Sequence, residues 1–284
     1  MRGRIIAALL AVASLRLSAQ GASPKQSTVR VGGAQIFYID SGGTGQAVIF
    51  LHSATGHSQV WEHQIPAFTA AGYRFIAYDR RGWGRTRLEE PNASPGTAAD
   101  DLLGLMDQLG IAKAHLVSTA AGGFVALDFA LSYPARVRSL VLANSIGGVQ
   151  DESYLALGRR LRPSPQFDAL PPDIRELGPA YRASDPAGAE RWIQNEKASR
   201  PEAARAPAQP MRNRVTLALL ETLRVPTLII AGGADLYAPP PVMRMLADRV
   251  KGSQYLVIPE AGHSAYWEQP DVFNRAVTAF LRKH

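Results

Sequence analysis

Short runs of apolar residues recur along the chain from residue 29 onward, and longer stretches with helical spacing lie between them. Continuous apolar runs of about five residues are typical of strands that are buried on both faces of a parallel sheet. Gly32 and Gly33 are suited to the turn of an opening hairpin. The runs that we predict to be strands are residues 29–31, 35–39, 47–51, 74–78, 115–117, 137–143, 227–231 and 254–258.

Four stretches between these runs have the spacing of amphipathic helices, at residues 97–109, 121–132, 239–250 and 271–282. Thr97 suits a helix start, Gly110 a helix end, and Pro239 the beginning of a helix, where a missing N–H costs little. The alternation of strand and helix predicts an α/β fold with a doubly wound, mostly parallel sheet.

The alternation stops between residues 147 and 223, a stretch that is rich in Arg, Ala and Pro and has helical patches at 154–161 and 187–197. We interpret this stretch as a helical lid inserted over the carboxyl edge of the sheet, where ligands bind in open α/β sheets. The core of the domain is then formed by residues 27–146 and 224–284.

The first 22 residues have the order of a secretory signal peptide: Arg2 and Arg4, an apolar run at 5–15, and small residues at 18–22. Cleavage after Ala19 or Ala22 would place the protein in the periplasm or outside the cell. The apolar run is shorter than the roughly 20 residues that a membrane span needs. We therefore expect no stable membrane insertion.

Composition and charge exclude several classes of function. The chain has no cysteine, and its six histidines do not have the spacing of a zinc site, so we expect no metal. The formal charge is +7, of which Arg2, Arg4 and Arg16 carry three, leaving +4 after residue 22. The tightest basic cluster, at residues 159–162, lacks interleaved aromatic residues and reads as a solvated helix face. We expect no nucleic-acid partner.

Candidate chemistry lies at the ends of the predicted strands. Residues 51–56 (LHSATG) follow one strand, 78–86 (YDRRGWGRT) follow the next, and 116–123 (LVSTAAGG) join a strand to a helix. Residues 232–239 (GGADLYAP) and 259–264 (PEAGHS), the latter followed by Glu268 and Pro270, come after the last two strands. In a parallel sheet, all these segments meet at one edge.

These segments together resemble the α/β-hydrolase superfamily over nearly all of residues 29–284, and in particular lid-bearing enol-lactonases, C–C bond hydrolases and arylesterases. The resemblance implies that His263 is the base and that Asp235 orients it, in the chain order that the fold requires. It also implies an oxyanion hole formed by the backbone N–H groups of Ala54 and Ala121. Residues 116–123 correspond to the nucleophile elbow G-x-S-x-G, with Ala120 at the serine position.

Three further residues are candidates for contacts with a substrate: Ser53, where the family usually has glycine, Trp83, and Thr119. Of these, Thr119 is expected to point away from the site. Ser53, Ser118 and Ser145 lie near strand ends and could each replace the missing nucleophile, although none occupies the elbow.

Ala120 has three explanations: an exchange introduced to trap substrate, an enzyme that works without the serine, or a silent binding protein. We treat Ala120 as natural, and the retained His263 and Asp235 favour chemistry. The sequence thus predicts a monomeric or homodimeric hydrolase of a small apolar ester, lactone or C–C bond substrate, with no cofactor. A ligand-binding pseudo-hydrolase, and a cofactor-free lyase or oxygenase with His263 as base, remain alternatives.

Overall fold

The computed structural model describes residues 23–90 and 94–284, so the predicted signal peptide at 1–22 lies outside the described residues. A single mixed sheet runs through the molecule in the order β1-β2-β4-β3-β6-β7-β8-β9, with β5 paired to β2. Strands from β4 to β9 along this order are parallel, and β1, β2 and β5 are antiparallel to their neighbours. The strands are β1 (Lys25–Val31), β2 (Ala34–Asp40), β3 (Ala47–Leu51), β4 (Arg74–Tyr78), β5 (Arg87–Leu88), β6 (Ala114–Thr119), β7 (Val137–Ala143), β8 (Thr227–Gly232) and β9 (Gln254–Ile258).

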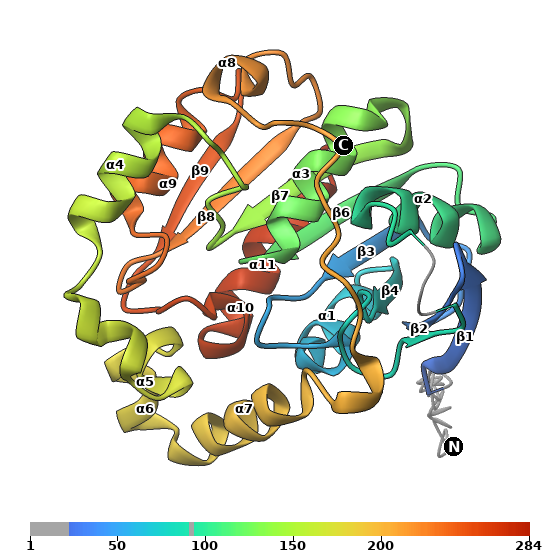
Figure 1. Ribbon diagram of the computed structural model, residues 1–284, viewed down its shortest axis with the longest axis horizontal. Helices are drawn as coiled ribbons and strands as arrows, with labels where there is room; N and C mark the ends of the chain where they lie inside the picture. Colours follow the sequence, from blue (N-terminus) through green and yellow to red (C-terminus); the bar gives the residue numbers. More distant parts are fainter. Residues whose placement is uncertain (1–22, 91–93) are drawn as a thin grey trace, which may run out of the picture.

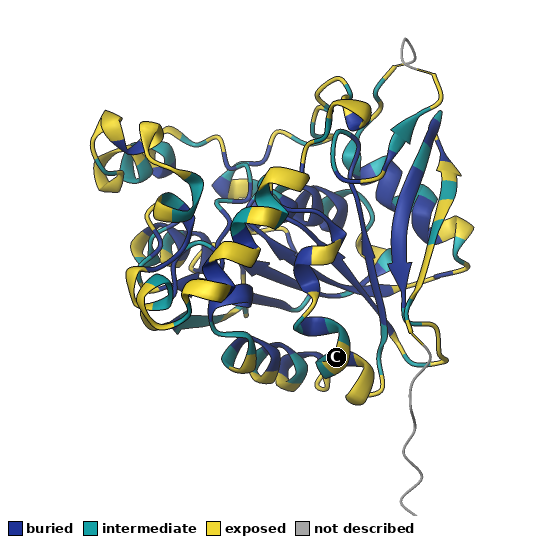
Figure 2. Ribbon diagram, turned by 90° about the horizontal axis from the view of Figure 1, so that it is seen from below, coloured by how far each residue is buried: buried dark blue, intermediate teal, exposed yellow. Residues whose placement is uncertain are grey.

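Helices cover both faces of this sheet, and the apolar side chains between the layers form two buried clusters. Figure 2 shows the strands as the buried centre of the molecule, with exposed residues on the outer faces of the helices. The helices that flank the sheet are α1 (Gln64–Ala70), α2 (Ala98–Gln108), α3 (Gly122–Ser132), α9 (Pro240–Ala247), α10 (Ala265–Glu268) and α11 (Pro270–Leu281).

Capping residues, glycine and proline mark several helix ends, as the sequence predicted. The Thr97 hydroxyl accepts a hydrogen bond from the N–H of Asp100 at 3.1 Å and so caps α2, which ends before Gly110 at φ +65°. Both α9 and α11 begin with a proline, where the missing N–H leaves no hydrogen bond unmade. The doubly wound, mostly parallel α/β sheet is confirmed.

The first strand is longer than predicted. It begins at Lys25, four residues before the predicted start, and pairs with β2 from Lys25 opposite Asp40 to Val31 opposite Ala34. The added residues are polar and mostly exposed because β1 is an edge strand, so they carry no apolar pattern.

Between residues 147 and 223 the chain forms helices and coil, with no strand in this described stretch. Figure 1 shows α5, α6 and α7 together at one border of the molecule and α4 beside α9. Residues 205–216 then return across the molecule as coil. The α-helices of the stretch are α4 (Glu152–Leu161), α5 (Pro172–Glu176), α6 (Pro179–Ser184), α7 (Pro186–Ala198) and α8 (Leu217–Leu220). No helix within the described residues is long and apolar enough to cross a membrane.

Candidate active site

Ala120 occupies a sharp turn between β6 and α3. Its φ of +48° lies in the left-handed region, which alanine rarely adopts. The turn is held by close packing, because a Cβ on Gly122 would lie 2.2 Å from the carbonyl oxygen of Leu51. A Cβ on Gly123 would lie 2.2 Å from the Ser145 hydroxyl. A strained strand-to-helix turn is therefore present where the nucleophile elbow is predicted, with a methyl group at its tip.

His263 and Asp235, the predicted base and its partner, are in contact opposite this turn. The Nδ1 atom of His263 lies 2.8 Å from Oδ2 and 3.0 Å from Oδ1 of Asp235. Burial alone would lower the pKa of His263, but the Asp235 charge and hydrogen bond, with the charges of Glu176 and Glu268, raise that pKa to about 9. Burial would raise the pKa of Asp235, but the charge and hydrogen bond of His263 hold it below its usual value.

Asp235 is fixed by further donors. The N–H groups of Tyr237 and Ala238 donate to its Oδ1 at 2.8 and 3.0 Å. Asn144 donates from Nδ2 to Oδ2 of Asp235 at 2.9 Å and to the carbonyl oxygen of Gly262 at 3.0 Å. Sequence reasoning missed Asn144, although its place directly after a buried strand was the available signal.

The predicted oxyanion turn lies next to the elbow, where Trp83 donates from Nε1 to the carbonyl oxygen of Ala54 at 2.8 Å. Neither the Ala54 N–H nor the Ala121 N–H donates a hydrogen bond within residues 23–90 and 94–284. Ala121 lines the cavity beside His263 and directly precedes the start of α3, where negative charge is favoured, whereas Ala54 does not line that cavity.

Two buried carboxyl groups join the helical stretch 147–223 to the site, and the sequence did not single them out for this role. Glu176 in α5 accepts a hydrogen bond from the Thr55 hydroxyl at 2.9 Å, and burial raises its pKa. Glu268 accepts hydrogen bonds from the N–H groups of Gly262 and Gly178. Burial raises the pKa of Glu268 to about 7, although these N–H groups work against the shift.

A cavity of about 190 Å³ opens between the elbow and the base. The residues that line it include Ala120, Ala121, Ser145 and His263, with Phe124, Ile146 and Tyr237 adding aromatic and aliphatic surface and Arg162 a positive charge. Within the described residues, no group of three or more His, Cys, Asp or Glu side chains could hold a metal.

The three candidate substrate contacts do not line this cavity. Thr119 is fully buried, and Ser53 is buried with its hydroxyl 3.1 Å from that of Thr55. Trp83 lines a different cavity, which adjoins this one at Ala121 and Phe124. Side chains alternate along the strand, which turns Thr119 away from the site, as its place before the elbow led us to expect.

Only one of the three replacement serines lines the cavity. The Ser118 hydroxyl donates to the carbonyl oxygen of Val141 inside the sheet and is fully buried. Ser145 does line the cavity, but its hydroxyl accepts from the N–H of Gly147 at 3.2 Å and has no hydrogen bond to His263. A serine without a base contact is not activated as a nucleophile.

The fold and the site define an α/β hydrolase, and the comparisons with known proteins agree. Residues 48–276 match the model of the alpha/beta hydrolase family, and the chain belongs to that family. A 2-hydroxy-6-oxononadienedioate/2-hydroxy-6-oxononatrienedioate hydrolase of Comamonas testosteroni is 29% identical over 261 residues, covering 86% of this chain and 90% of the relative.

Solved structures show the same architecture. A thermophilic esterase from Thermogutta terrifontis, solved with malate bound, is 30% identical with a TM-score of 0.74, covering 92% of this chain and 99% of the esterase. The enol-lactonase from Burkholderia xenovorans LB400 is 23% identical with a TM-score of 0.69, covering 90% of this chain and 99% of the lactonase, and supports the fold alone. The relatives support a hydrolase of small substrates.

Proposed function

We propose that this protein hydrolyses a small ester, lactone or C–C bond substrate through His263 and Asp235, without an acyl-enzyme intermediate. The observation that carries the proposal is the 2.8 Å contact between His263 Nδ1 and Asp235 Oδ2, beside an elbow whose Ala120 offers no nucleophile. The fold alone hosts many reactions, so the dyad and not the fold supports the chemistry.

In the proposed reaction, His263 removes a proton from a water molecule, and the oxygen of that water forms a bond to the substrate carbonyl carbon. The negative charge on the carbonyl oxygen is stabilised by the N–H groups of Ala54 and Ala121, and one such donor is worth roughly 3 kcal/mol. The tetrahedral intermediate then breaks its bond to the leaving group, which takes the proton from His263. Asp235 stabilises the imidazolium that forms between these steps.

The test compares the native protein with Ala120→Ser and His263→Ala on 4-nitrophenyl esters and lactones. We expect steady turnover without a burst in the native protein, a loss of at least about 100-fold in His263→Ala, and a burst in Ala120→Ser. A fluorophosphonate probe should label only the serine variant at position 120. A native protein that is inert while Ala120→Ser is active would contradict the proposal.

One observation favours a second function, a carboxylate-binding protein without turnover. A pKa of about 9 keeps His263 in its imidazolium form at neutral pH, in a cavity that is also lined by Ala121, whose N–H donates no hydrogen bond within the described residues. Such a site attracts an anion instead of activating water. Inert native protein that binds carboxylates, with binding lost in His263→Ala, would favour this function.

A further inference from the structure

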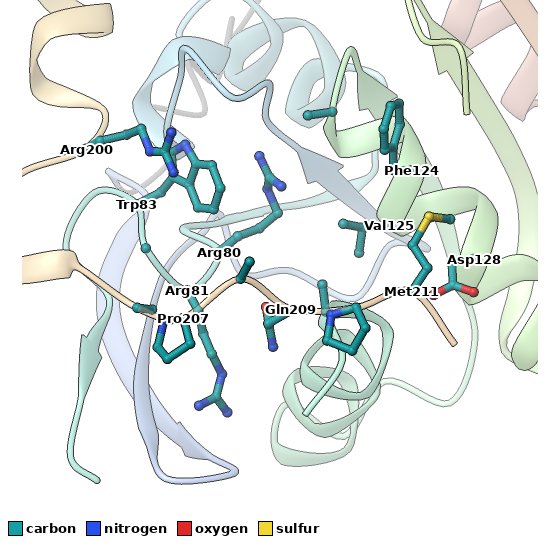
Figure 3. Close-up of a pocket in the computed structure, with 16 residues that line it drawn as sticks. Arg80, Arg81, Trp83, Phe124, Val125, Asp128, Arg200, Pro207, Gln209 and Met211 are labelled. Atoms are coloured by element: carbon teal, nitrogen blue, oxygen red, sulfur yellow. The ribbon is translucent and has the colours of Figure 1, made fainter. Parts of the chain in front are cut away.

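A second cavity of about 260 Å³ adjoins the candidate catalytic cavity at the first turn of α3, and the proposed reaction does not use it. Ala121 and Phe124 line both cavities. Figure 3 shows the second cavity between the arginines of the β4 loop and the strap formed by residues 206–211.

Arg80 brings an uncompensated charge into this cavity. Its side chain is buried, with 7% of the residue exposed, and no carboxylate lies within 4 Å of its guanidinium in the described part of the chain. Nη2 donates to the carbonyl oxygen of Ser53 at 3.0 Å, but the buried Nε has no hydrogen-bond partner. A buried charge without a counter-ion is costly, and native proteins rarely retain one without a use.

The neighbouring arginine shows the contrast. Arg81 also lines the cavity, but its side chain extends away from that of Arg80 (Figure 3) and donates to Asp101 at 2.6 Å from Nε and 2.8 Å from Nη2. The Arg81 charge is therefore neutralised within the fold, and the Arg80 charge is not.

A second cation lies close to Arg80. The guanidinium carbons of Arg80 and Arg200 are 4.3 and 4.5 Å from the centroid of the Trp83 ring. Burial, with the charge of Arg200 adding to it, lowers the pKa of Arg80 to about 10, so Arg80 remains charged at neutral pH. The Trp83 ring compensates part of this charge, while the charge of Arg200 still acts on Arg80.

The carboxylate that lines the cavity is already bonded elsewhere. Asp128 accepts hydrogen bonds from the backbone N–H groups of Arg212 and Asn213, at 2.8 and 3.0 Å. It also accepts one from Nδ2 of Asn213 at 2.7 Å. The cavity therefore has an excess of positive charge on the side formed by Arg80, Trp83 and Arg200.

We propose that Arg80, assisted by Arg200, binds a carboxylate group of the substrate. Nη1 of Arg80 is not among the buried unpartnered atoms and makes no hydrogen bond within the described residues, so this edge of the planar guanidinium can donate to a carboxylate. The substrate would then be a small carboxylic acid whose reacting carbonyl lies across the α3 turn, beside Ala120. The carbonyl position rests on the proposed function, and the binding of the carboxylate does not.

The test measures binding and needs no turnover. Isothermal titration of the native protein with phenylacetate and with phenylacetamide, its neutral counterpart, should give at least about tenfold tighter binding of the carboxylate. Arg80→Gln should remove this preference, and Arg200→Gln should reduce it about threefold, because its contribution is made from an exposed position. Arg205 is an exposed arginine that pairs with Glu202 and lies next to the strap in sequence. Arg205→Gln is therefore the matched control and should leave the preference for phenylacetate unchanged.

Equal affinity for the two ligands in the native protein would overturn the proposal. So would a preference that is lost in His263→Ala and kept in Arg80→Gln, because the anion would then lie in the catalytic cavity. Inorganic phosphate that displaces phenylacetate at equal concentration would contradict a carboxylate site. If Arg80→Gln fails to fold, a preference unchanged in the exposed Arg200→Gln overturns the proposal.

The outcome is separable from that of the proposed function. If the native protein prefers phenylacetate but hydrolyses no ester, the Arg80 site is supported and the proposed reaction is contradicted. If it hydrolyses neutral esters in preference to carboxylate-bearing esters, the reaction is supported and the Arg80 site is contradicted.

Discussion

The backbone N–H of His263 donates a 2.7 Å hydrogen bond to the carbonyl oxygen of Glu176, which joins the loop of the base to a helix of the lid. The side chain of Glu176 meanwhile accepts from the Thr55 hydroxyl on the oxyanion turn. One lid residue is thus bonded to both halves of the proposed machinery. The position of α5 therefore affects the base and the oxyanion turn together.

The first prediction concerns the pH dependence of activity. A general base must be neutral, and the pKa of His263 is raised to about 9, so kcat/KM of the native protein should rise with pH, reach half its maximum near pH 9 and level off above it. The measurement is kcat/KM for a neutral ester between pH 6 and 10. A rate that is half-maximal near pH 6.5, the ordinary pKa of histidine, would show that the surrounding carboxylates do not act on the base.

The second prediction identifies the source of part of that shift. The charge of Glu176 raises the pKa of His263, so Glu176→Gln should move the rising limb of the pH profile to lower pH. The glutamine oxygen can still accept from Thr55, which leaves the turn in place. Asp173→Asn removes a charge from the same helix and is the control, with no expected shift. Equal shifts in both variants would indicate a long-range charge effect without a specific role for Glu176.

Much of the fold and part of the site follow from sequence because their signals are local. Apolar runs and proline or glycine boundaries lie within a few residues of the elements they define, and the elbow and dyad are motifs at strand ends. Asn144 meets Asp235 across 91 positions of the chain, and Thr55 meets Glu176 across 121. Such contacts depend on which strands become neighbours and how the lid folds back, which no local pattern encodes.

The third prediction concerns Glu268 and stability. Its folded-state pKa is raised from 4.5 to about 7, so its ionisation favours the unfolded chain, and stability should be lost as pH rises through this window. Glu268→Gln cannot ionise. The free energy of unfolding of the variant, relative to that of the native protein, should therefore increase between pH 4.5 and 7, by up to roughly 3 kcal/mol. Urea unfolding at pH 5 and pH 8 measures the difference.

The exposed Glu260 provides the control for this experiment, because Glu260→Gln removes the same charge nearby without changing a buried group. A Glu268→Gln variant whose stability relative to the native protein is the same at both pH values would show that the carboxyl group titrates normally in the folded protein.

The fourth prediction separates two roles of Asn144. Its φ of +50° suits asparagine or glycine, and its side chain donates to Asp235 and to Gly262. Asn144→Gly keeps the backbone conformation and loses both hydrogen bonds, which should cost about 1.5–3 kcal/mol because one acceptor is a buried carboxylate. Asn144→Ala loses the same bonds and adds the strain of a Cβ at positive φ, about 1 kcal/mol more.

Urea unfolding of these two variants measures the cost of the lost hydrogen bonds and the cost of the backbone strain. The value of kcat/KM measures how far the hydrogen bond from Asn144 to Asp235 supports the proposed base, His263. Both variants should lose activity to a similar extent, because the donor to Asp235 is absent in each, while their stabilities differ. Equal stability of the glycine and alanine variants would mean that the turn relaxes and holds no strain. Native activity in both would mean that the N–H groups of Tyr237 and Ala238 are sufficient to orient Asp235 against His263.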